Sequence, residues 1–175
     1  MKGNNLVTER VQNLPRGTDF ADRIDSAIHR SRETGRPFFV ILLQIENIEA
    51  FSKRKPRYVV LNLYKELFQI LRKAVHQSQF VGTFQDGFGF VFDAVDVGQV
   101  DFIGKKITAL ATQVIRGGHY NDLSSRWSEI IAQFLTPGKP SVIYPRIGWA
   151  IYPRDGENAT QVVKRALCHV DELNR

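Results

Sequence analysis

The sequence predicts an α/β or α+β domain in which helices flank a mixed central sheet, and three observations support this prediction. Apolar runs of strand length alternate along the chain with amphipathic helical stretches, an order typical of a sheet covered by helices. Two of the apolar runs are separated only by a short turn sequence, which indicates a hairpin and excludes a purely parallel sheet. A length of 175 residues with 43% hydrophobic residues is enough for one domain with a buried core.

The first half of the chain begins with a helix that Thr18 or Asp19 can cap and that Gly35 can end. An uninterrupted apolar run at 38–45 follows, which is typical of a buried strand. A basic loop with Pro56 then leads into a second helix. The apolar faces predicted for these two helices are Phe20, Ile24 and Ile28 in the first and Leu63, Leu67, Leu71 and Ala74 in the second.

The second half begins with the hairpin, whose strands are expected at 80–83 and 88–92, with Asp-Gly at the centre of the turn 84–87. The remaining elements expected are a helix at about 100–115, a short amphipathic helix within 119–140, a strand at 142–152 that Pro145 edges or interrupts, and a helix at 159–173.

Composition narrows the function classes. The formal net charge of +6 favours acidic partners, and the excess is spread along the chain apart from one cluster at 53–57. No apolar run approaches the roughly 20 residues that span a bilayer, so a cytoplasmic location without direct membrane insertion is expected. Cys168 is the one cysteine and is expected as a small buried side chain, and the four histidines have no metal-ligand spacing. No cofactor and no metal are expected.

The segment 145–156, Pro-Arg-Ile-Gly-Trp-Ala-Ile-Tyr-Pro-Arg-Asp-Gly, is similar to the strand motif S-I-G-V-A-x-Y-P-x-D-G of GGDEF domains, the family of diguanylate cyclases. The segment 13–20 is similar to the entry motif G-L-x-N-R-x-x-F, and the order of elements between them follows the family. The resemblance implies a nucleotidyl-cyclase-like GGDEF-domain fold over 13–175, with a helical insertion at 119–140 and a lead segment at 1–12.

The same resemblance implies that the catalytic groups are altered. Active members join two GTP molecules into cyclic di-GMP with divalent metal held by carboxylates. The metal-binding aspartate of L-D-I-D-x-F-K is replaced by Gln44, a poor Mg²⁺ ligand, while Glu46 keeps an acid at the second position. The guanine-reading asparagine and aspartate fall on Ser52 and Leu61, and a leucine does not accept the N–H donors of guanine.

The signature motif and the inhibitory site are altered as well. The signature falls on Gln85-Asp86-Gly87-Phe88-Gly89 or, in a register one residue earlier, places Asp86 and Phe88 on its aspartate and phenylalanine. Neither register contains a glutamate, so the second metal ligand is missing. At the inhibitory R-x-x-D site, His76 and Gln79 replace the arginine and the aspartate.

The retained fold and the altered site favour a degenerate, catalytically inactive module of cyclic di-GMP-related bacterial signalling, which contacts another signalling or scaffold protein. The alternative is a receptor that binds cyclic di-GMP or GTP in the altered cleft without turnover, through Lys53, Arg54, Lys55 and Arg57. The plain interpretation of that cluster is a solvated surface. A cyclase with the substitute acids Glu46, Glu49 and Asp86 is disfavoured, and so is binding of DNA or RNA, for which no signature is present.

One segment is a candidate partner surface. Trp127, Ile130 and Phe134 lie at helical spacing within 119–140. Such a stripe normally packs inward and closes the core. Exposure of Trp127 and Phe134 would instead indicate a surface that recognises a partner.

Overall fold

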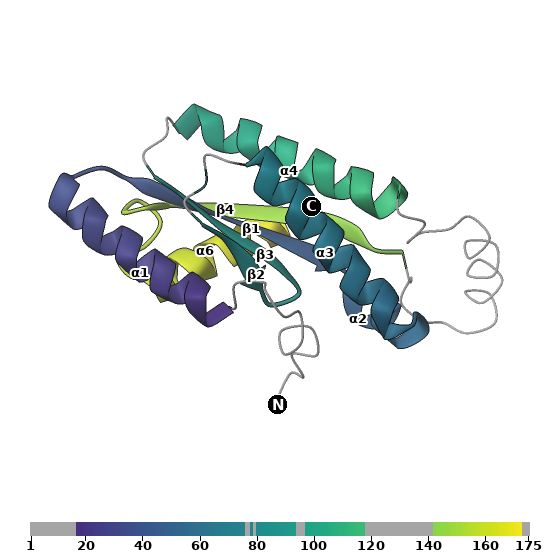
Figure 1. Ribbon diagram of the computed structural model, residues 1–175. Helices are drawn as coiled ribbons and strands as arrows, with labels where there is room; N and C mark the ends of the chain where they lie inside the picture. Colours follow the sequence, from purple (N-terminus) through teal and green to yellow (C-terminus); the bar gives the residue numbers. More distant parts are fainter. Residues whose placement is uncertain (1–16, 76–77, 79, 94–96, 118–141, 173–175) are drawn as a thin grey trace.

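The structure is a computed structural model that describes residues 17–75, 78, 80–93, 97–117 and 142–172. The expected lead segment at 1–12 and the insertion at 119–140 lie outside the described residues. The helices are α1 (Gly17–Thr34), α2 (Ile48–Arg54), α3 (Arg57–Ala74), α4 (Val97–Gly117) and α6 (Ala159–Glu172), and the strands are β1 (Phe38–Glu46), β2 (Phe80–Phe84), β3 (Gly87–Asp93) and β4 (Tyr144–Tyr152) (Figure 1).

The predicted helices and strands are confirmed at these places, with two corrections of detail. Helix α1 begins at Gly17, so Thr18 and Asp19 lie in its first turn and not before it. The expected basic loop is largely a short helix, α2, whose last turn contains Lys53 and Arg54. Asn47, at φ 60°, turns the chain directly from β1 into this helix, and asparagine tolerates that left-handed conformation.

The sheet has the strand order β2-β3-β1-β4. All three pairings are antiparallel, so the α/β (α+β) class is confirmed but the expected parallel component is not present among these four strands. The physical reason is that β3 lies between β1 and β2, which run in the same direction. In the first βαβ unit, β1 and β2 are connected through α2 and α3, and β3 is inserted between these two strands. In the second unit, β3 and β4 are connected through α4, and β1 is inserted between them.

Both faces of β1 are covered, which explains its uninterrupted apolar run. Phe39, Ile41 and Leu43 belong to the core formed with α3 and α4. Phe38, Val40 and Leu42 belong to the core formed with α1 and α6. Figure 1 shows these two pairs of helices on opposite sides of the sheet. The three-layer arrangement covers both faces of the sheet and leaves the carboxyl end of β1 and the hairpin turn at the surface.

Strand β4 is an edge strand and runs without interruption through Pro145, which lies opposite Ile45. An edge position tolerates proline, because one side of the strand makes no ladder hydrogen bonds. The side-chain amide of Asn47 donates to the carbonyl of Val142 at 3.1 Å. This bond connects the start of α2 to the chain just before β4.

Asp155 and Gly156, the Asp-Gly pair at the end of the segment 145–156, both have a structural role in the turn after β4. The Ile151 backbone N–H donates to Asp155 Oδ2 at 2.7 Å, and the Arg154 guanidinium donates to both carboxylate oxygens at 2.9 Å. Partial burial alone would raise the pKa of Asp155, but these hydrogen bonds and the nearby arginines lower it. A side chain at Gly156 would lie 2.8 Å from Gln161 Cβ, so only glycine fits. These residues position the first turn of α6.

Helix α6 also corrects one expectation. Val162 and Ala166 are buried on its inner face, whereas Cys168 is exposed and not a buried side chain. The position of Cys168, two residues after Ala166, places it off the inner face of a helix with 3.6 residues per turn. None of the helices in the described part of the chain combines the length and apolar character required to cross a bilayer.

Candidate functional site

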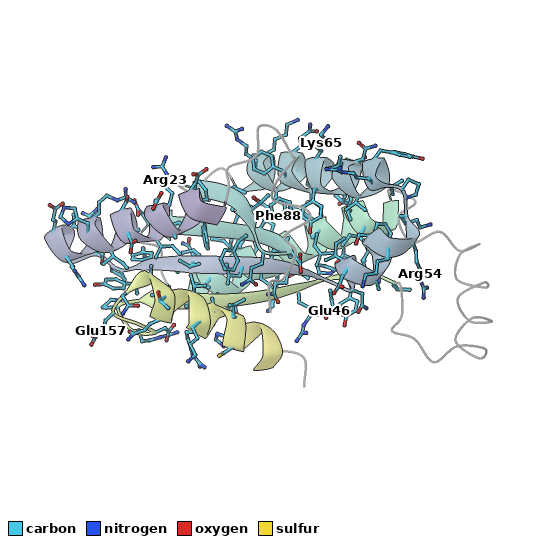
Figure 2. The ribbon with its side chains drawn as sticks, turned by 90° about the horizontal axis from the view of Figure 1, so that it is seen from below. Arg23, Glu46, Arg54, Lys65, Phe88 and Glu157 are labelled. Carbon is cyan, nitrogen blue, oxygen red and sulfur yellow. The ribbon has the colours of Figure 1, made fainter. Side chains whose placement is uncertain are left out.

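The altered positions of the cyclase resemblance gather at one end of the sheet. Pairing of β1 with β3 places Gln44 opposite Gly87 and Leu43 opposite Phe88. The hairpin turn, Gln85 and Asp86, lies beside the end of β1, where the Ile45 N–H donates to the Asp86 carbonyl at 3.1 Å. Figure 2 shows Phe88 in the interior and Glu46 and Arg54 near the end at which α2 lies.

Gln44 meets another neutral amide. Its Nε2 donates to Gln85 Oε1 at 3.4 Å, a long hydrogen bond between two exposed groups. Amide oxygens carry no formal charge, so this pair attracts a divalent cation far less than two carboxylates would.

Glu46 is engaged by an arginine of the neighbouring strand. Arg146 Nη1 donates to Glu46 Oε2 at 2.9 Å. The side chains are 34% and 18% exposed for Glu46 and Arg146, so the ion pair is partly shielded from water. Arg146 was not a predicted site residue, since nothing in the local sequence brings it to a glutamate 100 positions away.

Tyr64 is buried at this end, whereas Asp86 is an exposed residue of the turn whose carboxyl is partly shielded from water. Burial raises the pKa of the Asp86 carboxyl, and the nearby Glu49 carboxylate adds to the effect. The Tyr64 hydroxyl is fully buried and has no hydrogen-bond partner among the described residues. Burial, and secondarily the charge of Asp86, raises the pKa of Tyr64 far above its ordinary value. Its ring lies 5.7 Å from that of Phe88.

The hairpin turn differs from the expected one. Gln85 and Asp86 form a two-residue turn, with Gln85 at φ 48°, and Gly87 is already the first residue of β3. A Cβ atom at Gly87 would lie 1.8 Å from the Leu43 carbonyl oxygen. Gly87 therefore packs on β1 as part of the strand. The two turn residues are Gln85 and Asp86, one position earlier than the expected Asp86-Gly87. Phe88 is fully buried.

The other altered positions lie on the helices. Ser52, on α2, donates through Oγ to the Glu49 carbonyl at 2.8 Å, and the half-buried Leu61 lies on α3. In the basic cluster, Lys53 pairs with Glu49 at 2.7 Å. For Arg54, Lys55 and Arg57 the described residues provide no ion pair.

Four predicted residues, His76, Gln79, Trp127 and Phe134, lie outside the described residues. Within the described ranges, no group of three or more histidine, cysteine, aspartate and glutamate side chains comes together as a metal site. The divalent metal implied by the resemblance does not fit this donor set, because Gln44 supplies an amide and Glu46 is held by Arg146.

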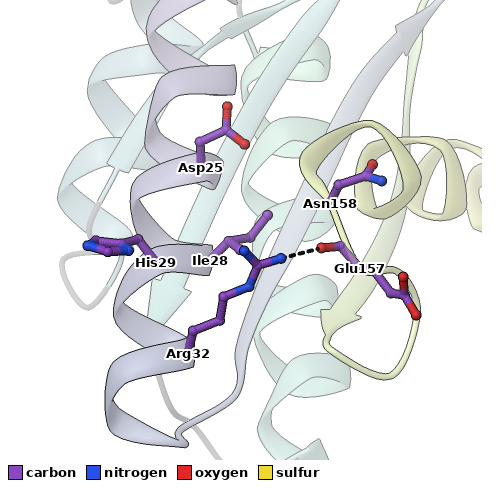
Figure 3. A pocket seen from close by; sticks show the side chains of 6 residues that line it. All are labelled: Asp25, Ile28, His29, Arg32, Glu157 and Asn158. Atoms are coloured by element: carbon purple, nitrogen blue, oxygen red, sulfur yellow. Dashed lines mark hydrogen bonds between the residues drawn. The ribbon is translucent and has the colours of Figure 1, made fainter.

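A hollow of about 300 Å³ lies away from this end, between α1 and the turn that precedes α6 (Figure 3). Its lining residues are Asp25, Ile28, His29, Arg32, Glu157 and Asn158. Arg32 crosses it and donates to the Glu157 carbonyl at 3.3 Å and to the Tyr152 hydroxyl at 3.2 Å. Tyr152 pairs with Phe38 at the start of β1, so the hollow lies at the end of β1 opposite to Gln44.

The sequence matches no family model and no curated protein, so the comparison rests on solved structures. The FimX GGDEF domain from Pseudomonas aeruginosa is similar with a TM-score of 0.69 at 13% identity, over 94% of this chain and 91% of that chain. The GGDEF domain of DgcB from Caulobacter crescentus, solved in complex with c-di-GMP, has a TM-score of 0.65 at 14% identity, over 100% and 92% of the two chains.

A third similar structure is the diguanylate cyclase SiaD from Pseudomonas aeruginosa, solved in complex with its activator SiaC. Its TM-score is 0.65 at 13% identity, over 93% of this chain and 55% of that chain. These likenesses confirm the expected GGDEF-domain fold.

Proposed function

We propose that this chain is a GGDEF-like module without diguanylate cyclase activity, which acts in the cytoplasm, in cyclic di-GMP-related bacterial signalling, by contacting another protein. The observation that carries the proposal is the ion pair between Glu46 and Arg146 at 2.9 Å, beside the neutral amide of Gln44. Glu46, the acid kept at the second position of the L-D-I-D-x-F-K segment, is thereby paired with a cation of its own chain, and the principal ligand position is an amide.

The electrostatics of this pair support inactivity. Mg²⁺ requires several oxygen ligands at about 2.0–2.1 Å in near-octahedral geometry. To bind at Glu46 it would have to displace the Arg146 guanidinium or lie beside it, and two cations a few ångströms apart repel each other. The signature supplies no substitute, because the position of its glutamate is Gly87 or Phe88 in the two registers.

The direct test is incubation of the purified protein with GTP and Mg²⁺, followed by chromatographic detection of cyclic di-GMP. We expect no product under conditions in which an active diguanylate cyclase converts GTP completely. Formation of product by the parent protein would contradict the proposal, and its loss in the Glu46→Gln variant would show that Glu46 serves catalysis in spite of Arg146.

The protein-contact part of the proposal is supported by the complete core beside the altered site, and by SiaD, a structural relative solved with its activator protein. We propose Trp127 and Phe134 as part of the contact surface. The chain has two tryptophans, so the Trp149→Phe variant leaves Trp127 as the single emitter. We expect red-shifted emission and efficient quenching by acrylamide. Blue-shifted, protected emission would place Trp127 in the core and remove it from the surface.

The alternative function is a nucleotide receptor. Arg54, Lys55 and Arg57 support it, because these cations lie at the α2–α3 junction without ion pairs among the described residues and are available for phosphates. If this function holds, replacing Lys53, Arg54, Lys55 and Arg57 by glutamine abolishes binding of cyclic di-GMP or GTP in a calorimetric titration. The matched control replaces four other exposed cations, Arg23 on α1, Arg36 in the loop before β1, Lys105 on α4 and Lys164 on α6. Equal binding by both variants would exclude this route.

A further inference from the structure

The positive charge that is scattered in the sequence is concentrated on one layer of the fold. Helices α3 and α4, which cover one side of the sheet, carry seven lysines and arginines and two acids. Helices α1 and α6, which cover the other side, carry five lysines and arginines and six acids. Along the sequence the excess is spread out apart from the cluster at 53–57, but in the fold an excess of five positive charges lies on the α3–α4 layer, while the opposite layer is slightly negative.

The seven cations all point to solvent. They are Arg57, Lys65, Arg72, Lys73, Lys105, Lys106 and Arg116, and each is exposed. Figure 2 shows Lys65 projecting from α3 away from the sheet. Within the described residues none of the seven forms an ion pair. Lys106 donates to the Ala74 carbonyl at 2.9 Å, and this bond bridges α4 to the end of α3. We call this surface the basic face.

Apolar side chains are exposed on the same two helices. Of the four large hydrophobic residues exposed in the described part of the chain, three lie here: Phe102 at 70%, Tyr58 at 65% and Ile70 at 38% exposed. Phe102 is one helical turn before Lys106, and Ile70 is one turn before Ala74. Because Lys106 donates to the Ala74 carbonyl, the helical turn 102–106 of α4 lies beside the turn 70–74 of α3, and each of these turns carries one of the exposed apolar residues.

We propose that the basic face binds peripherally to an anionic lipid membrane surface. A layer of lysines and arginines is attracted by acidic headgroups, and single exposed apolar side chains add contact with the acyl boundary. The composition favours lipid over a protein partner. Four of the seven cations are lysine, a residue depleted in protein interfaces.

The arrangement leaves the rest of the domain accessible. The α1–α6 layer and its slightly acidic surface face away from such a membrane, on the far side of the sheet (Figure 1). A domain bound in this orientation is held at the membrane without any helix that crosses it. Binding of the basic face to a membrane requires neither catalytic inactivity nor contact with a protein.

The test is co-sedimentation of the purified full chain with vesicles. One set contains phosphatidylglycerol and phosphatidylcholine, and the other contains phosphatidylcholine alone. We expect binding to the first set only, weakening steeply with added salt. Replacing Lys65, Lys73 and Lys105 by glutamine is expected to lower the partition coefficient on the order of 100-fold, since each cation near an anionic surface contributes about one kcal/mol.

The matched control removes the same charge elsewhere, by Arg23→Gln, Arg36→Gln and Lys164→Gln, and is expected to retain most of the binding. The Phe102→Ser variant is expected to bind more weakly with an unchanged salt dependence. Equal loss in the control triple variant would overturn the proposal, because it would show attraction by net charge alone. Equal binding to neutral vesicles, or complete release by an equal charge concentration of soluble polyglutamate or RNA, would also overturn it.

Discussion

At the scale of single residues, the strength of the Glu46–Arg146 ion pair is measurable. The exposures of 34% and 18% leave water to screen part of the attraction, so we expect a coupling energy of about 1 kcal/mol. A double-mutant cycle with Glu46→Gln and Arg146→Gln, followed by urea unfolding, gives this value. A coupling near zero would mean that Arg146 does not hold Glu46 in solution.

Tyr64 gives a second residue-scale prediction. Its hydroxyl is buried without a partner among the described residues, and an unpaired polar group in the core costs stability. The Tyr64→Phe variant keeps the ring against Phe88 and removes the hydroxyl. We expect the free energy of unfolding to rise by about 1 kcal/mol or to stay the same. A clear loss of stability would show that the hydroxyl is hydrogen-bonded in the folded protein.

Asp155 gives a prediction on pH. Its pKa is lowered in the folded state, because hydrogen bonds and the nearby arginines outweigh the effect of burial. The carboxylate therefore adds stability above the unfolded pKa of about 3.9, and this contribution disappears as the pH falls through the lower, folded pKa. We expect Asp155→Asn to cost about 2 kcal/mol at neutral pH, by thermal or urea unfolding, and the difference from the parent protein to shrink in acid.

The control for this prediction is Asp93→Asn. Asp93 forms an exposed pair with Arg30 at 3.4 Å, and such surface pairs contribute little to stability. If both variants lose the same stability at neutral pH, the turn after β4 has no special role.

The sequence predicted part of the site at this scale. Gln44, Glu46 and the turn residues were identified by the family resemblance, and the structure brings them together. Arg146 and Tyr64 were missed because their relevance comes from contacts across the fold. Arg146 reaches Glu46 through strand pairing over 100 positions, and the burial of Tyr64 depends on the hairpin that covers it.

At the scale of elements, the tight hairpin depends on Gly87. A methyl group there would lie 1.8 Å from the Leu43 carbonyl, so Gly87→Ala forces β1 and β3 apart. We expect a loss of roughly 3 kcal/mol in the free energy of unfolding, or failure to fold. The control is Gly117→Ala at the end of α4, where nothing lies within 4 Å, and it is expected to be neutral or slightly stabilising. Similar losses in both variants would contradict the close packing of the hairpin on β1.

Long periodic or uniformly apolar segments were predictable as elements, and short ones were not. Helices α1 and α3 and strand β1 could be predicted, because the local spacing of their apolar residues indicates which side chains are buried. Helix α2 was mistaken for a loop, since its seven residues carry too little periodicity and end in lysine and arginine. The antiparallel pairing of β1 with both neighbours was not predictable, because strand order depends on contacts that local patterns do not encode.

At the scale of the whole molecule, the GGDEF-domain fold was predictable from two terminal motifs and the order of elements, and the structural likeness at 13–14% identity confirms it. The charge asymmetry between the two helical layers was not predictable in the same way. It appears only when α3 and α4, which are separated in sequence by the hairpin, lie together on one side of the sheet.

The central claim is that this domain keeps the fold of a cyclase while its site does not hold a metal-bound nucleotide. The measurement that tests it most directly is a calorimetric titration of the purified protein with GTP, in the presence of Mg²⁺ and again in the presence of a chelator. We predict that Mg²⁺ makes no difference to the heat, because Arg146 neutralises Glu46 and Gln44 supplies only an amide. Binding that appears only with Mg²⁺, resists added salt and is lost in Glu46→Gln would contradict the account.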